Sequence, residues 1–218
     1  MDPLSAENTL SISDENKYNI ELANFLFSNN ALKFGRFLLS SGIESSYYID
    51  LRLIPSFPYL FRKTILAMRD FILSNKYTCN FDRIGTVPTS GLIFGSSLAY
   101  EIFKPLIYVR KESKDYGTSR LVEGKFSIDS KILIVDDVAT TGSSVIKAIN
   151  HIRDSGGVVE NVLVIVDRLE SARRNLQEIG VNLMSITDIS KLTKVLFENK
   201  KISINQLEDV KSQIIEKN

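Results

Sequence analysis

Two adjacent carboxylates followed by small hydroxyl residues form the segment of this sequence best suited to chemistry. Asp136 and Asp137 come directly after the apolar run 132–135. A loop of small residues follows, made of Thr140, Thr141, Gly142, Ser143 and Ser144. Hydroxyl groups, unblocked amides and the positive end of a following helix together make a cradle for an anion such as phosphate. The segment is not the Gly-Lys-Thr phosphate loop, because no lysine follows the glycine, and it is not GxGxxG.

The two acids need a purpose of their own, because a carboxylate beside a phosphate cradle repels the phosphate. Ribose hydroxyls, a hydrated Mg²⁺ ion or positive charge developing on a sugar carbon would suit them. A pair of acids alone would favour an ordinary strand-to-helix turn that has a capping serine and exposed acids. The acids combined with the hydroxyl loop predict a site for a phosphorylated sugar.

A second segment, residues 108–126 (YVRKESKDYGTSRLVEGKF), is rich in cations. It is too polar to pack in a core and too long for a tight turn. A solvated hairpin is one interpretation. The other is a loop that supplies cations to a polyphosphate and closes over it. Tyr116 in this loop can donate a hydrogen bond but does not titrate near neutral pH.

Three further segments carry polar groups at the ends of apolar runs. In residues 83–97, Pro88, Thr89, Ser90 and Gly91 open a helix, which makes a second start suited to an anion or a simple turn. In residues 164–170, Arg168 follows a buried strand and either binds a planar carboxylate or caps a loop. In residues 34–52, Tyr48 either lines a site or packs in a strand.

The elements that must position these residues form an α/β pattern. From residue 82, the apolar runs RIGTV, PLIYV, KILIV, NVLVIV and VNLMSI alternate with expected helices at 91–103, 144–155, 171–179 and 188–199. Runs without internal alternation indicate strands buried on both faces, and the helices between them indicate a parallel sheet. Ligands of such sheets bind beyond the carboxyl ends of the strands. Helices at 15–30, 58–75 and 203–217 and two short strands within 34–54 complete the expected elements.

The bulk properties exclude several classes of protein. The chain has 218 residues, a net charge of +1 and one cysteine, Cys79. We therefore expect no general attraction to nucleic acid and a reducing location, the cytoplasm. The N-terminal residues are not those of a signal peptide. No apolar run approaches the roughly 18 residues of a membrane span.

The segment ILIVDDVATTGSS (132–144) resembles the phosphoribosyl-diphosphate motif of the type I phosphoribosyltransferases. The string RKESKDYGTSRLVEG (110–124) resembles the catalytic loop of the orotate phosphoribosyltransferases within that family. The resemblance implies a five-stranded parallel sheet flanked by helices, with a small N-terminal hood over the site. We accordingly expect a hood at 1–57, a core at 58–199 and a C-terminal helix at 200–218. The implied reaction transfers the phosphoribosyl group to orotate, giving orotidine 5′-phosphate and diphosphate, with Mg²⁺ held mainly by substrate phosphates and water near the two acids.

The resemblance also implies roles for individual residues. Residues 140–144 would bind the ribose 5-phosphate, and Asp136 and Asp137 would meet the ribose and the metal shell. The expected contacts to diphosphate come from Arg110, Lys111, Lys114, Tyr116, Thr89 and Ser90. In the family, the loop that holds the last two often contains a cis peptide. Orotate would be bound by Tyr48, Thr140 and Arg168, with the arginine on its carboxylate. Catalysis would rest on Lys114 and the two acids.

The resemblance further implies a homodimer in which each loop 110–124 reaches the partner's site. Ser40 and Ser90 stand where relatives have lysine, and Ser46 where they have proline. Two other functions remain open: a phosphoribosyltransferase for a purine or another base, and a regulatory protein of the same fold that binds phosphoribosyl diphosphate.

Overall fold

A six-stranded sheet lies at the centre of the computed structural model, which describes residues 12–38, 44–75, 80–110 and 121–217. The strand order is β5-β4-β3-β6-β7-β8. The strands are β3 (Arg83–Thr86), β4 (Leu106–Val109), β5 (Val122–Glu123), β6 (Lys131–Ala139), β7 (Val158–Asp167) and β8 (Asn182–Asp188). All are parallel except β5, which pairs antiparallel with β4. The expected five-stranded parallel sheet is confirmed, and the short edge strand β5 was not expected.

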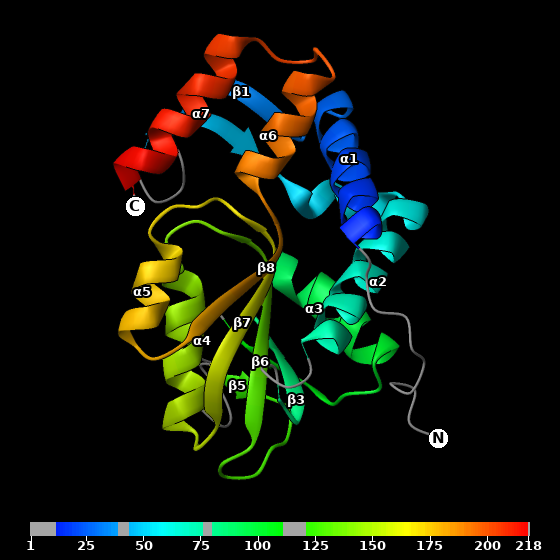
Figure 1. Ribbon diagram of the computed structural model, residues 1–218. Helices are drawn as coiled ribbons and strands as arrows, with labels where there is room; N and C mark the ends of the chain where they lie inside the picture. The colour runs from blue at the N-terminus through cyan, green and yellow to red at the C-terminus, as the bar shows by residue number, and fades with distance from the viewer. Residues whose placement is uncertain (1–11, 39–43, 76–79, 111–120, 218) are drawn as a thin grey trace.

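Helices cover both faces of the sheet, as the buried strands require (Figure 1). One side carries α2 (Pro58–Ser74) and α3 (Ser90–Glu101), and the other carries α4 (Ser143–Asp154) and α5 (Ala172–Glu178). Alternate residues of β6 serve the two sides: Leu133 and Val135 belong to one buried cluster, Ile132 and Ile134 to the other. This alternation explains why the strand is apolar at every position from 132 to 135.

The hood is built from both ends of the described chain (Figure 1). It contains α1 (Ile12–Ser28), the antiparallel hairpin β1 (Leu32–Leu38) and β2 (Glu44–Ile49), and the helices α6 (Ile189–Glu198) and α7 (Ile204–Lys217). Helix α1 packs on α6, and α7 packs on β2 and α6. A 3-10 helix, η2 (Leu51–Ser56), leads from β2 to α2. The domain limits at 57 and 199 stay a prediction, although α7 packs directly on the N-terminal hairpin.

Strand β6 is longer than expected, and this changes how the two acids are placed. Asp136 and Asp137 lie within the strand, which continues to Ala139, and not beyond its end. Neighbouring β3 stops at Thr86, opposite Val135. From Asp136 onward β6 is paired with β7, so its other edge opens next to the start of α3. Strand β4 lies on one side of β3 and β6 lies on the other, so the order of the strands reverses between β3 and β6. Open α/β sheets bind their ligands at such a reversal.

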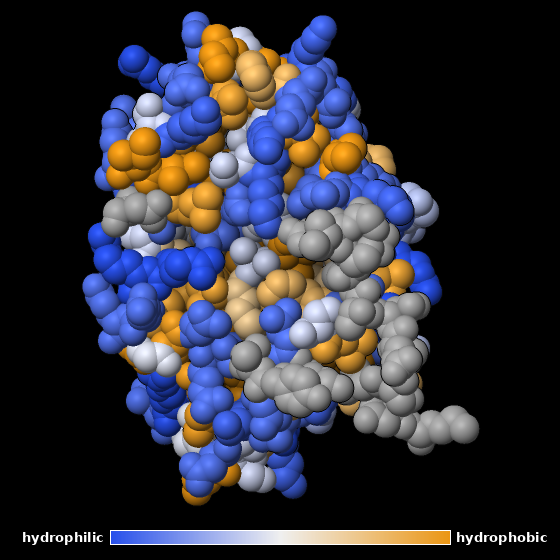
Figure 2. All heavy atoms as spheres, viewed as in Figure 1, coloured by the Kyte–Doolittle hydropathy of each residue, from blue (hydrophilic) through white to orange (hydrophobic). Residues whose placement is uncertain are grey.

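Hydrophilic side chains cover much of the face shown in Figure 2, and hydrophobic ones gather along α7. Ile204 and Ile215 of that helix are exposed. Within the described residues, no helix is both long and apolar enough to cross a membrane.

Candidate active site

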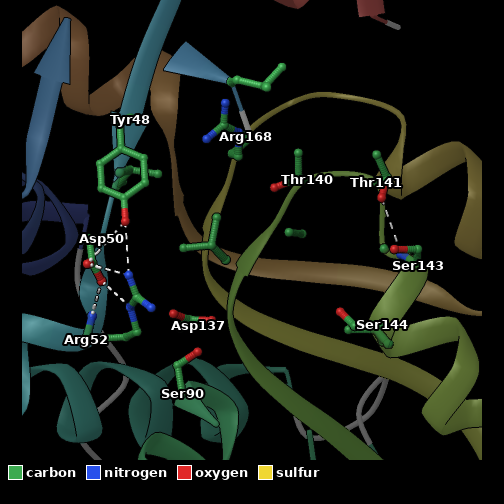
Figure 3. Close-up of a pocket in the computed structure, with 16 residues that line it drawn as sticks. Tyr48, Asp50, Arg52, Ser90, Asp137, Thr140, Thr141, Ser143, Ser144 and Arg168 are labelled. Atoms are coloured by element: carbon green, nitrogen blue, oxygen red, sulfur yellow. Dashed lines mark hydrogen bonds and ion pairs between the residues drawn. The ribbon is translucent and has the colours of Figure 1, made fainter. Parts of the chain in front are cut away.

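A cavity of about 480 Å³ opens at the carboxyl ends of β6 and β7, beneath the hood. Its volume is typical of a site for a small molecule. Figure 3 shows Tyr48, Asp50 and Arg52 of the hood on one side and the hydroxyl loop on the other. Asp137 and Ser90 lie at the base, and Arg168 lies between hood and loop. The predicted residues that line this cavity are Tyr48, Ser90, Asp137, Thr140, Thr141, Gly142, Ser143, Ser144 and Arg168.

The hydroxyl loop has the geometry of an anion cradle. Gly142 caps helix α4 in the left-handed conformation (φ 74°), and no side chain caps this helix end. The carbonyl of Thr140 accepts a hydrogen bond from the Ala172 amide (3.1 Å), and Asn175 Nδ2 donates to the Thr141 carbonyl (2.9 Å). These bonds tie the loop carbonyls to α5. The Ser143 N–H at the start of α4 donates a long hydrogen bond to Thr141 Oγ1 (3.4 Å). The next amides, of Ser144 and Val145, lack partners within the helix and remain for a bound anion.

The start of α3 forms the base of the cavity. The Pro88–Thr89 peptide bond is cis, as the resemblance implies, and no side chain caps this helix. Ser90 lines the cavity, whereas Thr89 is exposed outside it. A Cβ atom on Gly91 would lie 2.7 Å from Asp136 Oδ1, so only glycine lets the helix approach β6 this closely.

The two acids have different surroundings. Asp136 is 8% exposed, and its Oδ1 accepts the backbone N–H of Asp137 at 2.9 Å. Burial raises the pKa of the Asp136 carboxyl well above its ordinary value, and the adjacent charge of Asp137 raises it further. Asp137 is only partly buried and lines the cavity. Asp137 is therefore the acid that can meet a ligand directly, while Asp136 lies buried beside it and accepts the N–H of Asp137.

Arg168 is buried, so the interpretation of an exposed loop cap is wrong. Its Nε donates to Glu170 Oε1 at 3.0 Å and its Nη2 to Ser45 Oγ at 2.8 Å. The guanidinium carbon lies 4.2 Å from the centre of the Tyr47 ring, in a cation–π contact. Tyr47 is wholly buried, which fits strand packing, whereas Tyr48 lines the cavity.

Asp50 and Arg52 also line the cavity, and neither was singled out in the sequence. Arg52 donates from Nε to Asp50 Oδ1 (2.7 Å) and from Nη2 to Tyr48 Oη (3.0 Å). The hydrogen bond from Arg52 lowers the pKa of the Asp50 carboxyl. The string Asp-Leu-Arg directly after a strand was the available signal. Arg52 places an exposed cation at the cavity, where Ser90 stands in place of a lysine that the resemblance implies.

The remaining predicted residues lie apart from the cavity or outside the described residues. Arg110 ends up beside β5, with its Nη1 3.7 Å from Glu123 Oε1, and does not line the cavity. Lys111, Lys114 and Tyr116 fall outside the described residues, as does Ser40. Their expected roles stay predictions.

Comparison with known proteins gives concordant relatives. The model of the phosphoribosyl transferase domain matches residues 67–191. An orotate phosphoribosyltransferase of Cenarchaeum symbiosum is 42% identical over 172 residues, which cover 79% of this chain and 86% of the relative. The solved orotate phosphoribosyltransferase of Aeropyrum pernix is 34% identical with a TM-score of 0.70, covering 84% of this chain and 99% of that one.

A larger protein shares the fold as well. The UMP synthase of Leishmania donovani superposes with a TM-score of 0.79 at 28% identity, over 91% of this chain but only 42% of that one. The family model covers more than half of this chain, and the archaeal relatives match along nearly their whole length. The chain therefore belongs to the type I phosphoribosyltransferase family, and within it to the orotate phosphoribosyltransferases.

Proposed function

We propose that this chain transfers the 5-phosphoribosyl group from phosphoribosyl diphosphate to orotate, giving orotidine 5′-phosphate and diphosphate. One observation carries the proposal: a single cavity is lined by a phosphate cradle, an acid and a buried arginine. The cradle and the acid suit a phosphorylated sugar. The arginine suits a planar carboxylate, which orotate has and uracil, adenine and hypoxanthine lack.

The donor would lie across the base of the cavity. Its 5-phosphate would accept hydrogen bonds from the first amides of α4 and from the hydroxyls of residues 140–144. Asp137 would accept hydrogen bonds from the ribose hydroxyls. Ser90 and the uncapped start of α3 would meet the diphosphate.

The acceptor base would lie on the hood side. Arg168 would bind the orotate carboxylate, and the partly buried ring of Tyr48 would lie beside the pyrimidine. Thr140 lies between Arg168 and Thr141 (Figure 3), so its hydroxyl would donate a hydrogen bond to the base.

The reaction needs alignment and charge stabilisation more than covalent help. The bond from ribose C1 to the diphosphate oxygen breaks, and its electron pair leaves with the diphosphate. A ring nitrogen of orotate, whose proton passes to water, then bonds to C1 from the opposite face. Asp137, which lines the cavity, would stabilise the positive charge that develops on the sugar carbon, and Asp136 would hold the Asp137 backbone in place. The orotate ring is itself acidic, so a strong general base is not needed.

Cations must balance the leaving diphosphate. We assign this to Lys111, Lys114 and Arg110 of the loop 110–124, with Tyr116 as a hydrogen-bond donor. Arg52 adds a positive charge from the hood, because it lines the cavity and keeps much of its side chain exposed.

A Mg²⁺ ion fits this site as a partner of the donor. Among the described residues, no cluster of three or more acids, histidines or cysteines could hold a metal by itself. Asp137 offers one carboxylate at the cavity, which matches an ion held mainly by phosphate oxygens and water. Such an ion would neutralise charge on the diphosphate.

We further propose that the protein acts as a homodimer in the cytoplasm, each loop 110–124 completing the partner's site. The resemblance of that loop supports sharing, and the exposed apolar side chains of Tyr59, Tyr100 and Phe103 support a second chain on α2 and α3. The single cysteine supports a reducing location.

The test is loss of orotate absorbance with phosphoribosyl diphosphate and Mg²⁺, run beside adenine and hypoxanthine. Turnover of orotate alone is expected. Turnover of a purine, with no turnover of orotate, would favour a purine phosphoribosyltransferase. Binding of phosphoribosyl diphosphate with no turnover of any base would favour a regulatory protein.

A further inference from the structure

A buried polar cluster connects the C-terminal helix to the arginine of the acceptor side. It consists of Ser45 on β2, Arg168 and Glu170 after β7, and Gln213 on α7. All four residues are less than 9% exposed. We propose that Gln213 is a positioning residue, which fixes Arg168 for the acceptor base through Glu170 and Ser45. This inference rests on the proposed function, in which Arg168 meets the orotate carboxylate.

The ion pair between Arg168 and Glu170 is the part of the cluster for which burial costs most free energy. Their side chains are 3% and 1% exposed, so the pair is removed from water. A buried ion pair offsets its loss of hydration only when its geometry is good and further hydrogen bonds support it. Glu170 Oε2 has no hydrogen-bond partner among the described residues, so the carboxylate depends on the donors to Oε1. Glu170 Oε1 already accepts from Arg168 Nε at 3.0 Å. A second donor to the same oxygen would fix the carboxylate.

Gln213 supplies that second donor and anchors it in turn. Its Nε2 donates to Glu170 Oε1 at 2.9 Å and to Ser45 Oγ at 3.1 Å. Its Oε1 accepts from the backbone N–H of Ser46 at 2.7 Å and from the Ser46 hydroxyl at 2.9 Å. One amide thus connects α7, the hairpin and the segment after β7.

Ser46 makes this arrangement possible. It lies opposite the bulge of β1, between the paired residues Ser45 and Tyr47, so its N–H is directed to α7. A proline, which stands here in the segment that this hairpin resembles, has no N–H to donate. The hydrogen bond from the Ser46 N–H to Gln213 therefore depends on serine, and not proline, at position 46.

The cluster controls the orientation of the guanidinium. Glu170 accepts a hydrogen bond from Nε of Arg168, and Ser45 accepts one from Nη2. The ring of Tyr47 packs against the face of the guanidinium. Within the described part of the chain, Nη1 has no hydrogen-bond partner, and Arg168 lines the cavity. Both anchors of the arginine contact Gln213. Loss of the glutamine should therefore weaken the acceptor site and spare the donor site, which lies on α3 and α4.

Two substitutions separate positioning from simple packing. Gln213→Glu keeps an acceptor for the N–H and hydroxyl of Ser46, so it keeps the docking of α7, but it places a second carboxylate against Glu170. Gln213→Met keeps the volume and removes every hydrogen bond. Ser212→Ala, at an exposed neighbouring position of the same helix, is the matched control.

The measurement is KM for orotate and for phosphoribosyl diphosphate, with the unfolding midpoint of each variant. Both Gln213 variants leave the buried carboxylate of Glu170 without its second donor, so Arg168 is held less firmly. We expect KM for orotate to rise roughly tenfold or more. KM for phosphoribosyl diphosphate should stay within about twofold. Parallel changes in both constants, or an unchanged KM for orotate, would overturn the inference.

A variant that fails to fold does not remove the test. Lys217→Met, at the end of α7, leaves Gln213 in place. It removes the ammonium 3.9 Å from Glu170 Oε2 together with its hydrogen bond to the Glu44 carbonyl (2.8 Å). A smaller rise in KM for orotate alone, roughly threefold, is then expected from a weak ion pair, and no rise would show that Glu170 does not pass the support of α7 to Arg168. Wild-type protein without orotate turnover would instead refute the proposed function itself.

Discussion

Replacing Asp136 with asparagine tests how the two acids divide stability and function. The carboxyl is almost fully buried, and its Oδ1 accepts the N–H of Asp137. Asparagine has the same shape and keeps that acceptor, so the substitution removes the charge and little else. Because burial and the adjacent acid both disfavour the charged form, the variant should be the more stable protein at neutral pH.

The sign of the pH dependence follows from the raised pKa of Asp136. The folded state holds the proton more tightly than the unfolded chain, so the wild-type protein is relatively most stable below the ordinary carboxyl pKa of 3.8. Stability is lost as the pH rises through the folded pKa. Since asparagine does not titrate, the advantage of Asp136→Asn should be absent near pH 4 and grow toward neutral pH.

The expected gain in the free energy of unfolding at neutral pH is on the order of 1 kcal/mol, as is common when an unfavourably placed group of an active site is replaced. Solvent screening reduces this stability gain only a little, because the Asp136 side chain is buried. For a chain of this length it corresponds to a rise in unfolding midpoint of about 2–4 °C. The assay is thermal unfolding followed by circular dichroism across the pH range, together with turnover.

Asp137→Asn is the matched control, because its side chain lines the cavity and is partly exposed. We expect a smaller gain in stability and a loss of roughly 10–100-fold in kcat/KM, the value of a charged hydrogen bond to the sugar. Asp136→Asn should keep more activity than this control. A lower midpoint in Asp136→Asn at neutral pH, or a gain that does not vary with pH, would refute the reasoning.

Three further substitutions test other parts of the site. Arg52→Met removes the hood cation and should raise KM for phosphoribosyl diphosphate roughly tenfold; an unchanged steady-state KM would show that Arg52 does not face the donor. Gly142→Ala forces a side chain into the left-handed conformation (φ 74°) and should cost about 1 kcal/mol in denaturant unfolding while weakening donor binding. Lys114→Ala should lower turnover by several orders of magnitude with an unchanged unfolding midpoint, and a near-normal rate would remove the loop from the mechanism.

Much of the fold could be predicted from periodicity alone. Apolar runs without alternation gave the five parallel strands, and the helices between them were found within about two residues of their limits. Strand β5 was missed because two residues inside a charged loop carry no period of their own. The end of β6 was placed too early, because the acids interrupt the apolar run while the backbone still pairs with β7.

The site was predictable where local chemistry defines it. The cradle at 140–144 and Asp137 needed only residue types at the end of an apolar run. For Arg168 residue types left a loop cap open, and its role came from the resemblance. The different roles of Asp136 and Asp137 depend on where β3 stops, which the sequence does not show. Gln213 could not be found at all, since its partners Ser45 and Glu170 lie 168 and 43 residues away along the chain.

The most direct test of the account compares orotate with uracil in the wild-type protein and in Arg168→Met, with phosphoribosyl diphosphate and Mg²⁺ present. The two bases differ only in the carboxylate assigned to this arginine. The wild-type protein should convert orotate and leave uracil unchanged. The variant should lose activity on orotate by roughly two orders of magnitude or more, with KM for phosphoribosyl diphosphate nearly unchanged. Equal use of both bases by the wild-type protein, or undiminished orotate turnover in Arg168→Met, would contradict it.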